Sequence, residues 1–232
     1  LKTVLTDDPF FAGIKTVFTI HNLQYQGVCS AGYMRTAGLD WKLFVPEKLE
    51  FYGKLNMIKA GIMYSDVVTT VSSKYAKEIQ TPVNGVGLAG VLRSRKDNLH
   101  GIINGLDYTE WDPQRDKKIA ARFSWNSFDR RSVNKKRLQQ LFGLPESSSP
   151  LIGMVSRLAE QKGFDLLRSV MKELMARELQ LVVLGSGEPQ YEAFLSAAAR
   201  TFPGKLAVKI SYDDALAKLI YAGSDMFLMP SR

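Results

Sequence analysis

Two cations, Arg157 and Lys162, stand where an apolar stretch of the sequence gives way to a helical one. The apolar stretch 151–155 predicts a strand, and the pattern over 164–177 predicts a helix. Because the amino end of a helix carries partial positive charge and unpaired N–H groups, the turn before it favours an anion. A guanidinium and an ammonium in that turn predict a diphosphate site. Without this context, a basic pair is more often a solvated turn.

Two glycines follow the next predicted strand, 180–184, in the run GSGE at 185–188. Gly185 and Gly187 let backbone N–H groups approach a phosphate or a sugar closely, just before Pro189 opens a predicted helix. The run lacks the third glycine of the dinucleotide fingerprint, so it gives poor support for NAD. A plain tight turn and a ligand-binding loop are equally compatible with this run alone.

Two further side chains follow the ends of predicted strands. His21 comes after the β-branched stretch 15–20, at the strand end where open α/β sheets bind ligands, although a lone histidine is more often structural. Tyr212 follows the strand 206–210 and suits either stacking on a flat ring such as adenine or an exposed surface position. The next two residues, Asp213 and Asp214, are predicted as helix caps rather than metal ligands.

The composition narrows the classes of protein. The 232 residues carry 31 Lys and Arg against 23 Asp and Glu, and the surplus of +8 suits polyanions in general. Cys29, His21 and His100 are the only cysteine and histidines, so no zinc-type cluster and no internal disulfide is predicted, which favours a reducing compartment. No apolar run reaches the roughly 18 residues of a membrane helix. No nucleophile elbow with a serine, histidine and acid is present, which disfavours a hydrolase.

Strands and helices alternate along the chain, which predicts an α/β fold with parallel sheets covered by helices. The segment 107–113 has neither the helical nor the strand periodicity, and a domain boundary is predicted near Asn98, giving domains 1–98 and 99–232. Strands are predicted at 15–20, 66–71, 99–103, 151–155, 180–184, 206–210 and 226–229, and helices at 52–64, 72–79, 129–142, 164–177, from 189, and 213–222.

Five motifs occur in order along essentially the whole chain: FTIHNLQYQG at 18–27, NGLD at 104–107 with WDP at 111–113, SRL at 156–158 with QKG at 161–163, GSGE at 185–188, and MPSR at 229–232. Together they resemble bacterial glycogen synthases and plant starch synthases. The resemblance implies a glycosyltransferase of the GT-B type, with two Rossmann-like domains whose parallel sheets face a cleft. It implies transfer of glucose from ADP-glucose to the non-reducing end of an α-1,4-glucan, with retention of configuration.

The resemblance also implies a role for each matching residue. Arg157 and Lys162 resemble the pair that grips the donor diphosphate and stabilises it as a leaving group. Gly185 and Gly187 match the loop beside the nucleotide, and Tyr212 resembles the aromatic residue near the adenine. In this scheme the domain 99–232 binds the nucleotide sugar, and no cofactor or metal is required.

Residues of the domain 1–98 are implied to lie on the acceptor side. His21 resembles the histidine that contacts the transferred glucose, and Asn22 and Gln24 are implied to face the acceptor. Asn104, from the turn near the hinge, resembles the residue that also reaches the sugar.

The sequence departs from the family at both ends. A Lys and Gly-rich loop near the start, and an acidic motif beyond Arg232 with the family's carboxylate, are absent from the sequence, so we expect an internal fragment that cannot catalyse alone. Two alternatives stay open: another two-domain nucleotide-sugar enzyme, phosphorylase-like or epimerase-like, and a basic α/β module that binds nucleic acid. The basic groups at 93–96 and 135–137 lack interleaved aromatic residues, which favours no nucleic-acid partner. The expected location is the bacterial cytoplasm or the plastid stroma, with no membrane partner.

Overall fold

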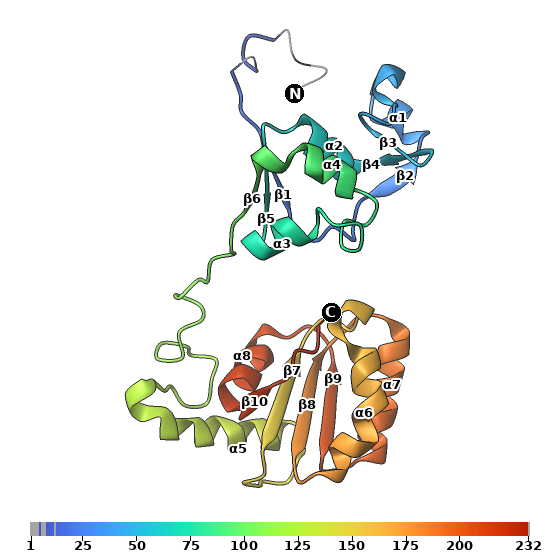
Figure 1. The fold of residues 1–232 in the computed structure, drawn as a ribbon. Helices are drawn as coiled ribbons and strands as arrows, with labels where there is room; N and C mark the ends of the chain where they lie inside the picture. The colour runs from blue at the N-terminus through green and yellow to red at the C-terminus, as the bar shows by residue number, and fades with distance from the viewer. Residues whose placement is uncertain (1–4, 6–7, 12, 232) are drawn as a thin grey trace. The chain divides into compact units, whose positions relative to one another are not determined.

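A computed structural model describes the chain except for residues 1–4, 6–7, 12 and 232, and Figure 1 shows its ribbon. The chain divides into two compact units, residues 1–105 (unit 1) and 106–232 (unit 2). This division comes later than the boundary predicted near Asn98, because strand β6 (Leu99–Gly101) pairs with β5 (Val67–Thr70) of the first sheet. The ladder between these two strands holds residues 99–101 in unit 1.

Unit 1 contains a parallel sheet of three strands in the order β1-β5-β6. The register places Val17 beside Val67 and Val68 beside Leu99, as expected for strands rich in β-branched residues. Ile20 and Val68 are fully buried against the helices of the unit. The remaining elements are β1 (Val17–Ile20), α2 (Met57–Tyr64), α3 (Ser73–Glu78), α4 (Ala89–Ser94) and the short 3-10 helix η2 (Lys96–Asn98).

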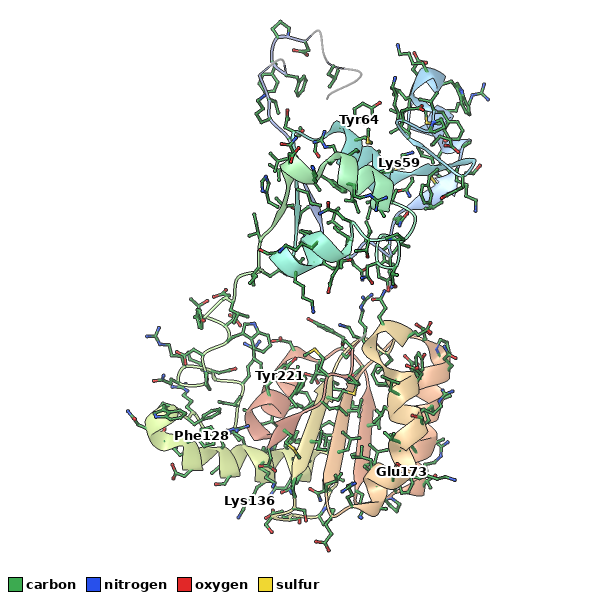
Figure 2. The ribbon with its side chains drawn as sticks, viewed as in Figure 1. Lys59, Tyr64, Phe128, Lys136, Glu173 and Tyr221 are labelled. Atoms are coloured by element: carbon green, nitrogen blue, oxygen red, sulfur yellow. The ribbon has the colours of Figure 1, made fainter. Side chains whose placement is uncertain are left out.

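Helix α2 is shorter than the helix predicted at 52–64, because residues 54–56 form a strand. Asn56 ends this strand and caps the helix, since its Oδ1 accepts a hydrogen bond of 2.9 Å from the N–H of Lys59. The Lys59 side chain is buried and donates to the carbonyl of Glu50 at 2.5 Å (Figure 2). Burial lowers the pKa of Lys59 below its ordinary value.

A second, antiparallel sheet in unit 1 has the strand order β2-β4-β3. Its hairpin turns at Tyr52 and Gly53, which both have positive φ, of 51° and 77°, as a two-residue primed turn requires. This sheet was not predicted from the sequence, because its strands are too short for a period of two to emerge. Its elements are β2 (Val28–Ser30), β3 (Glu50–Phe51) and β4 (Lys54–Asn56), with α1 (Tyr33–Thr36) and the 3-10 helix η1 (Trp41–Leu43) between β2 and β3.

Unit 2 contains a parallel sheet of four strands in the order β10-β7-β8-β9. Helices cover both faces (Figure 1). Along β8, Leu181 and Val183 pack in the cluster formed with α6 and α7, whereas Val182 and Leu184 pack in the cluster formed with α5 and α8. The predicted doubly covered sheet is thus confirmed. Its elements are α5 (Arg131–Leu141), β7 (Leu151–Val155), η4 (Glu160–Lys162), α6 (Phe164–Ala176), β8 (Gln180–Gly185), α7 (Pro189–Thr201), β9 (Leu206–Ile210), α8 (Asp214–Gly223) and β10 (Met226–Phe227).

The irregular first part of unit 2 is anchored to α8 before the 3-10 helix η3 (Trp125–Arg130) begins. Lys218 of α8 is 5% exposed, and its ammonium donates to the Glu110 carbonyl at 2.6 Å and to the Glu110 carboxylate at 2.9 Å. The same ammonium lies 5.1 Å from the centre of the Trp111 ring, and this ring meets Tyr221 edge-on at 5.7 Å. Figure 2 labels Tyr221. In the described part of the chain, no helix is long and apolar enough to cross a membrane.

Candidate functional site

Arg157 and Lys162 lie on the turn between β7 and α6. Arg157 follows the end of β7 and is exposed, and Lys162 ends the 3-10 helix η4 and is half-buried. Gly163 then takes the left-handed conformation, with φ of 71°, and α6 begins at Phe164. The sequence prediction is confirmed in this respect: both cations stand between a strand's carboxyl end and a helix's amino end.

Three glycines bring the loops at this edge of the sheet into backbone contact. A methyl group at Gly185 would overlap the carbonyl of Ser156, and one at Gly187 would overlap the carbonyl of Leu158. Gly163 passes equally close to the carbonyl of Pro230, which follows β10. Glycine at these three positions is therefore a packing requirement, because any side chain would force the loops apart.

Backbone hydrogen bonds align the glycine loop with the cationic turn. The N–H of Leu158 donates to the Ser186 carbonyl at 2.9 Å, and the N–H of Glu188 donates to the Leu158 carbonyl at 2.7 Å. The Glu188 carboxylate also accepts from the N–H of Glu160 at 3.2 Å. The loop after β8 thus supports the turn that carries Arg157 and Lys162.

The N–H of Gly187 has a protein partner that sequence reasoning missed. It donates to the carboxylate of Glu192, in the first turn of α7, at 2.8 Å. The sequence predicts that the backbone of this glycine pair approaches a ligand, whereas in the structure the Gly187 N–H bonds to Glu192 within the protein. The only signal in the sequence is an acidic residue in the first turn of a helix, which is too common to indicate a role.

Tyr212 lies on the next loop, at the carboxyl end of β9. Its side chain is 91% exposed, and the preceding residue joins the loop to β8 through a bond of 3.1 Å from the Ser211 N–H to the Gly185 carbonyl. Asp213 caps α8, as predicted, by accepting from the N–H of Leu216 at 2.9 Å. That hydrogen bond, together with the ammonium of Lys209, lowers the pKa of Asp213.

Five predicted site residues of unit 2 therefore share one edge of one sheet. They lie on the loops after β7, β8 and β9, and these three strands are neighbours in the sheet. This edge offers two cations, a glycine-lined backbone surface and an exposed aromatic ring, which are the groups that bind a diphosphate and a flat base. The five residues are Arg157, Lys162, Gly185, Gly187 and Tyr212.

Three predicted site residues of unit 1 lie together after β1. His21 is exposed and directly follows the strand, and Asn22 accepts a hydrogen bond of 3.0 Å from the N–H of Gln24. Leu23 between them is fully buried, and its N–H donates to the Tyr75 hydroxyl at 3.2 Å. The fourth residue, Asn104, is exposed in the irregular segment after β6.

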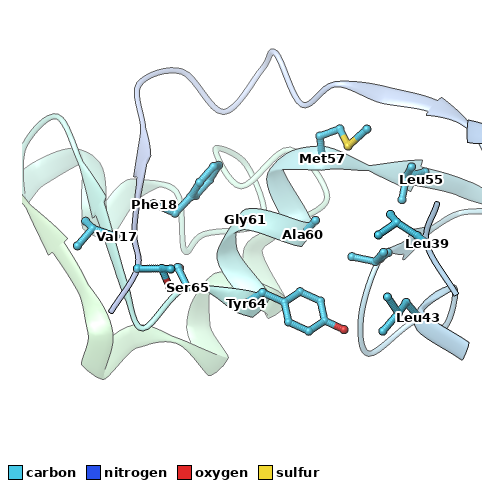
Figure 3. A pocket seen from close by; sticks show the side chains of 12 residues that line it. Val17, Phe18, Leu39, Leu43, Leu55, Met57, Ala60, Gly61, Tyr64 and Ser65 are labelled. Carbon is cyan, nitrogen blue, oxygen red and sulfur yellow. The ribbon is translucent and has the colours of Figure 1, made fainter. Parts of the chain in front are cut away.

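An apolar pocket in unit 1 contains none of the predicted site residues (Figure 3). It has a volume of about 340 Å³ and is lined by residues of β1 and α2 and of the segment 39–55, including Val17, Phe18 and Leu43. The hydroxyl groups of Tyr64 and Ser65, which also line it, are buried without a hydrogen-bond partner. Among the described residues, no group of three or more His, Cys, Asp or Glu side chains is placed to hold a metal ion.

Comparison with known proteins relates both units to one enzyme family. The model of the starch synthase catalytic domain matches residues 1–94, and the model of glycosyl transferases group 1 matches residues 137–232. The chain is 49% identical to a glycogen synthase of Koribacter versatilis over 232 residues, and 47% identical to one of Moorella thermoacetica over the same length. These alignments cover all of this chain and 48% of each relative, so the chain spans about half the length of the curated relatives it matches.

A solved structure agrees with the sequence relatives. The catalytic domain of starch synthase IV from Arabidopsis thaliana, solved with ADP and acarbose bound, matches 98% of this chain and 49% of that one, with a TM-score of 0.90 and 33% identity. The match confirms the predicted fold class, an α/β chain of the GT-B type with two Rossmann-like units. Along its whole length, the chain is similar to bacterial glycogen synthases and to this plant starch synthase.

Proposed function

We propose that this chain is part of a retaining glucosyltransferase that moves glucose from ADP-glucose to the non-reducing end of an α-1,4-glucan. The glycogen synthase relatives, and the starch synthase solved with ADP and acarbose, support this reaction and these two substrates. One observation carries the proposal: Arg157 and Lys162 both lie in the turn just before the amino end of α6, at the carboxyl edge of the sheet of unit 2. The bacterial relatives and the single cysteine support the bacterial cytoplasm as its location.

The two cations favour cleavage of the bond between the glucose and the diphosphate. As the sugar separates from the diphosphate, positive charge develops on the sugar ring and negative charge on the departing oxygen. Fixed cations at Arg157 and Lys162 bind this charge more strongly in the transition state than in the ground state, which lowers the barrier. In this scheme the two side chains carry the leaving-group charge themselves.

The remaining predicted residues take the roles that the family implies. In unit 2, Tyr212 stacks near the adenine. Gly185 and Gly187 lack side chains, so the nucleotide can approach the backbone of their loop closely. In unit 1, His21 contacts the transferred glucose, and Asn22 lies on the acceptor side.

Asn104 reaches the sugar from the segment after β6. Unit 1 is thus proposed as the acceptor side and unit 2 as the nucleotide-sugar side. The whole enzyme uses both, and neither a metal nor a cofactor is assigned to the described residues.

Binding of ADP to the 232-residue chain tests the proposal. We expect Arg157→Ala and Lys162→Ala each to weaken ADP binding about 10- to 100-fold in calorimetric titration, since a hydrogen bond to a charged group contributes about 1.5–3 kcal/mol. The control is Lys172→Ala, an exposed cation on α6 away from the turn, which leaves the affinity unchanged. Unchanged ADP affinity in both site variants would refute the assignment of the diphosphate to this turn. Parallel titrations with UDP and glucose 1-phosphate separate a synthase from a phosphorylase-like or epimerase-like enzyme.

A further inference from the structure

Val86 of unit 1 has a backbone conformation that its residue type disfavours. Its φ is 45°, in the left-handed region, where the branched Cβ crowds the backbone. The next residue, Gly87, also has a positive φ, of 81°, and the residue before Val86 is Gly85. A β-branched residue persists there only when the surrounding structure holds it, and such strain tends to occur at binding and catalytic sites.

A chain of buried amides holds the strained turn 84–87 in place. The side-chain amide of Gln26 donates to the carbonyl of Val86 at 2.8 Å, and its Oε1 accepts from the side-chain amide of Asn56 at 2.6 Å. Gln26 is 6% exposed and Asn56 is fully buried. A backbone bond of 2.7 Å from the Leu88 N–H to the Gly85 carbonyl closes the turn. In such a low-dielectric setting, these hydrogen bonds fix the turn rigidly.

The same glutamine ends the segment that begins with His21. Its backbone carbonyl accepts from the N–H of Ile58 at 3.1 Å, which fixes the segment to the start of α2. At the other end of the segment, Leu23 is buried and bonded to Tyr75. Residues 21–26 and the turn 84–87 are therefore parts of one hydrogen-bonded assembly, and Gln26 is the residue that connects them.

The turn 84–87 presents to solvent the groups that a sugar needs. Val83 beside it is 88% exposed, and Asn84 is exposed as well. Apolar methyl groups suit the C–H face of a pyranose ring, and an amide can both donate to and accept from its hydroxyl groups. A rigid surface of this kind binds with a smaller loss of conformational entropy than a mobile loop.

We propose that the turn 84–87 is a preformed wall of the glucan-binding surface of unit 1, and that Gln26 is the positioning residue that joins it to the segment of His21 and Asn22. The ligand class is a chain of α-1,4-linked glucose units, so this inference rests on the proposed function. Strain at Val86 is retained because relaxing it would move the wall.

Substitutions that relieve the strain test the proposal in the 232-residue chain. We expect Val86→Gly and Val86→Asn to raise the midpoint of thermal unfolding, because both residues adopt positive φ readily, and to raise the Kd for maltohexaose at least fivefold. Val86→Ala keeps a Cβ in the strained position and is expected to keep the affinity within about twofold. A purely structural valine would not give higher stability together with weaker sugar binding.

Gly90→Ala supplies a control for stability, because a methyl group at Gly90 meets no other atom within 4 Å. Gly90→Ala is expected to raise stability and leave maltohexaose binding unchanged. Gln26→Met keeps the volume of the side chain but removes both amide bonds, and we expect it to weaken maltohexaose binding as Val86→Gly does while ADP binding is retained. ADP binding reports on unit 2, so it separates loss of the wall from loss of the whole fold.

Wild-type affinity for maltohexaose in Val86→Gly, or an equal loss in Gly90→Ala, would overturn the proposal. A wild-type chain that binds ADP but no maltohexaose would also overturn it, since the preformed wall should then bind sugar. A wild-type chain that binds no ADP, by contrast, would refute the proposed function itself. The two failures are therefore distinguishable in one set of titrations.

Discussion

At the scale of single residues, Gly185 sets how close the cationic turn lies to the end of β8. Its Cα faces the carbonyl of Ser156, and the space between them admits no side chain. We expect Gly185→Ala to lower the free energy of unfolding by about 3 kcal/mol, since the clash falls on backbone rather than on a flexible side chain. It should also weaken ADP binding, because Arg157 directly follows Ser156. Gly90→Ala is the control. Gly90 is a residue of α4, and a methyl group there meets no other atom within 4 Å, so we expect the free energy of unfolding to rise by about 0.5–1 kcal/mol. Urea unfolding measures both.

Asp213 gives a prediction about pH at the same scale. The N–H of Leu216 and the ammonium of Lys209 lower its pKa, so the folded state favours the carboxylate. Its stabilising contribution is therefore fully present above the unfolded pKa, about 3.9, and is lost as the pH falls through the lower folded value. We expect the difference in unfolding free energy between wild type and Asp213→Asn, about 0.5–1 kcal/mol at pH 7, to shrink as the pH falls below about 4. A difference that stayed constant from pH 7 to pH 3 would contradict this.

At the scale of elements, the sequence predicted the parallel strands well and the small sheet not at all. Strands β7 and β8 are nearly continuous apolar runs that are buried on both faces, and such runs are visible in one sequence. Residues 52–56 are predicted as the start of a helix because Leu55 and Ile58 have helical spacing, but Asn56 caps α2 and the preceding residues pair as strands. Tertiary pairing overrides local periodicity where strands have only two or three residues.

The candidate site divides in the same way. Arg157, Lys162 and Tyr212 could be predicted as site candidates from the sequence, because each comes after an apolar run that predicts a strand. The Gly187 bond to Glu192 and the Gln26 bond to Val86 could not, since they join residues through side-chain geometry that no spacing encodes.

Lys218 tests how much one contact between elements stabilises the fold, because it joins α8 to the irregular segment before η3. Besides its bonds to Glu110, its ammonium lies 3.8 Å from the carboxylate of Asp116, whose side chain is 8% exposed. Lys218→Met leaves that carboxylate buried without its cation, and we expect a loss of about 2–3 kcal/mol in the free energy of unfolding. Lys172→Met, at an exposed position of α6, should stay within about 0.5 kcal/mol of wild type. Equal effects of the two substitutions in urea unfolding would show that the anchor contributes nothing.

At the scale of the whole molecule, the division into two units predicts the position of the first proteolytic cut. The described residues 102–107 form no helix or strand, and Leu106 and Tyr108 are 69% and 73% exposed, whereas Trp111 is held by Lys218 and Tyr221. Since proteolysis requires local opening of the backbone, limited chymotrypsin digestion should cleave after Leu106 or Tyr108 before it cleaves after Trp111.

All five predicted nucleotide-site residues of unit 2 lie beyond these cuts, so the fragment that begins at Asp107 or Thr109 should bind ADP within about threefold of the intact chain. Mass spectrometry identifies the first cut, and titration of the purified fragment measures its affinity. A first cut within 111–123 would contradict the anchoring by Lys218, and a folded fragment without ADP affinity would show that unit 1 is needed to complete the nucleotide site.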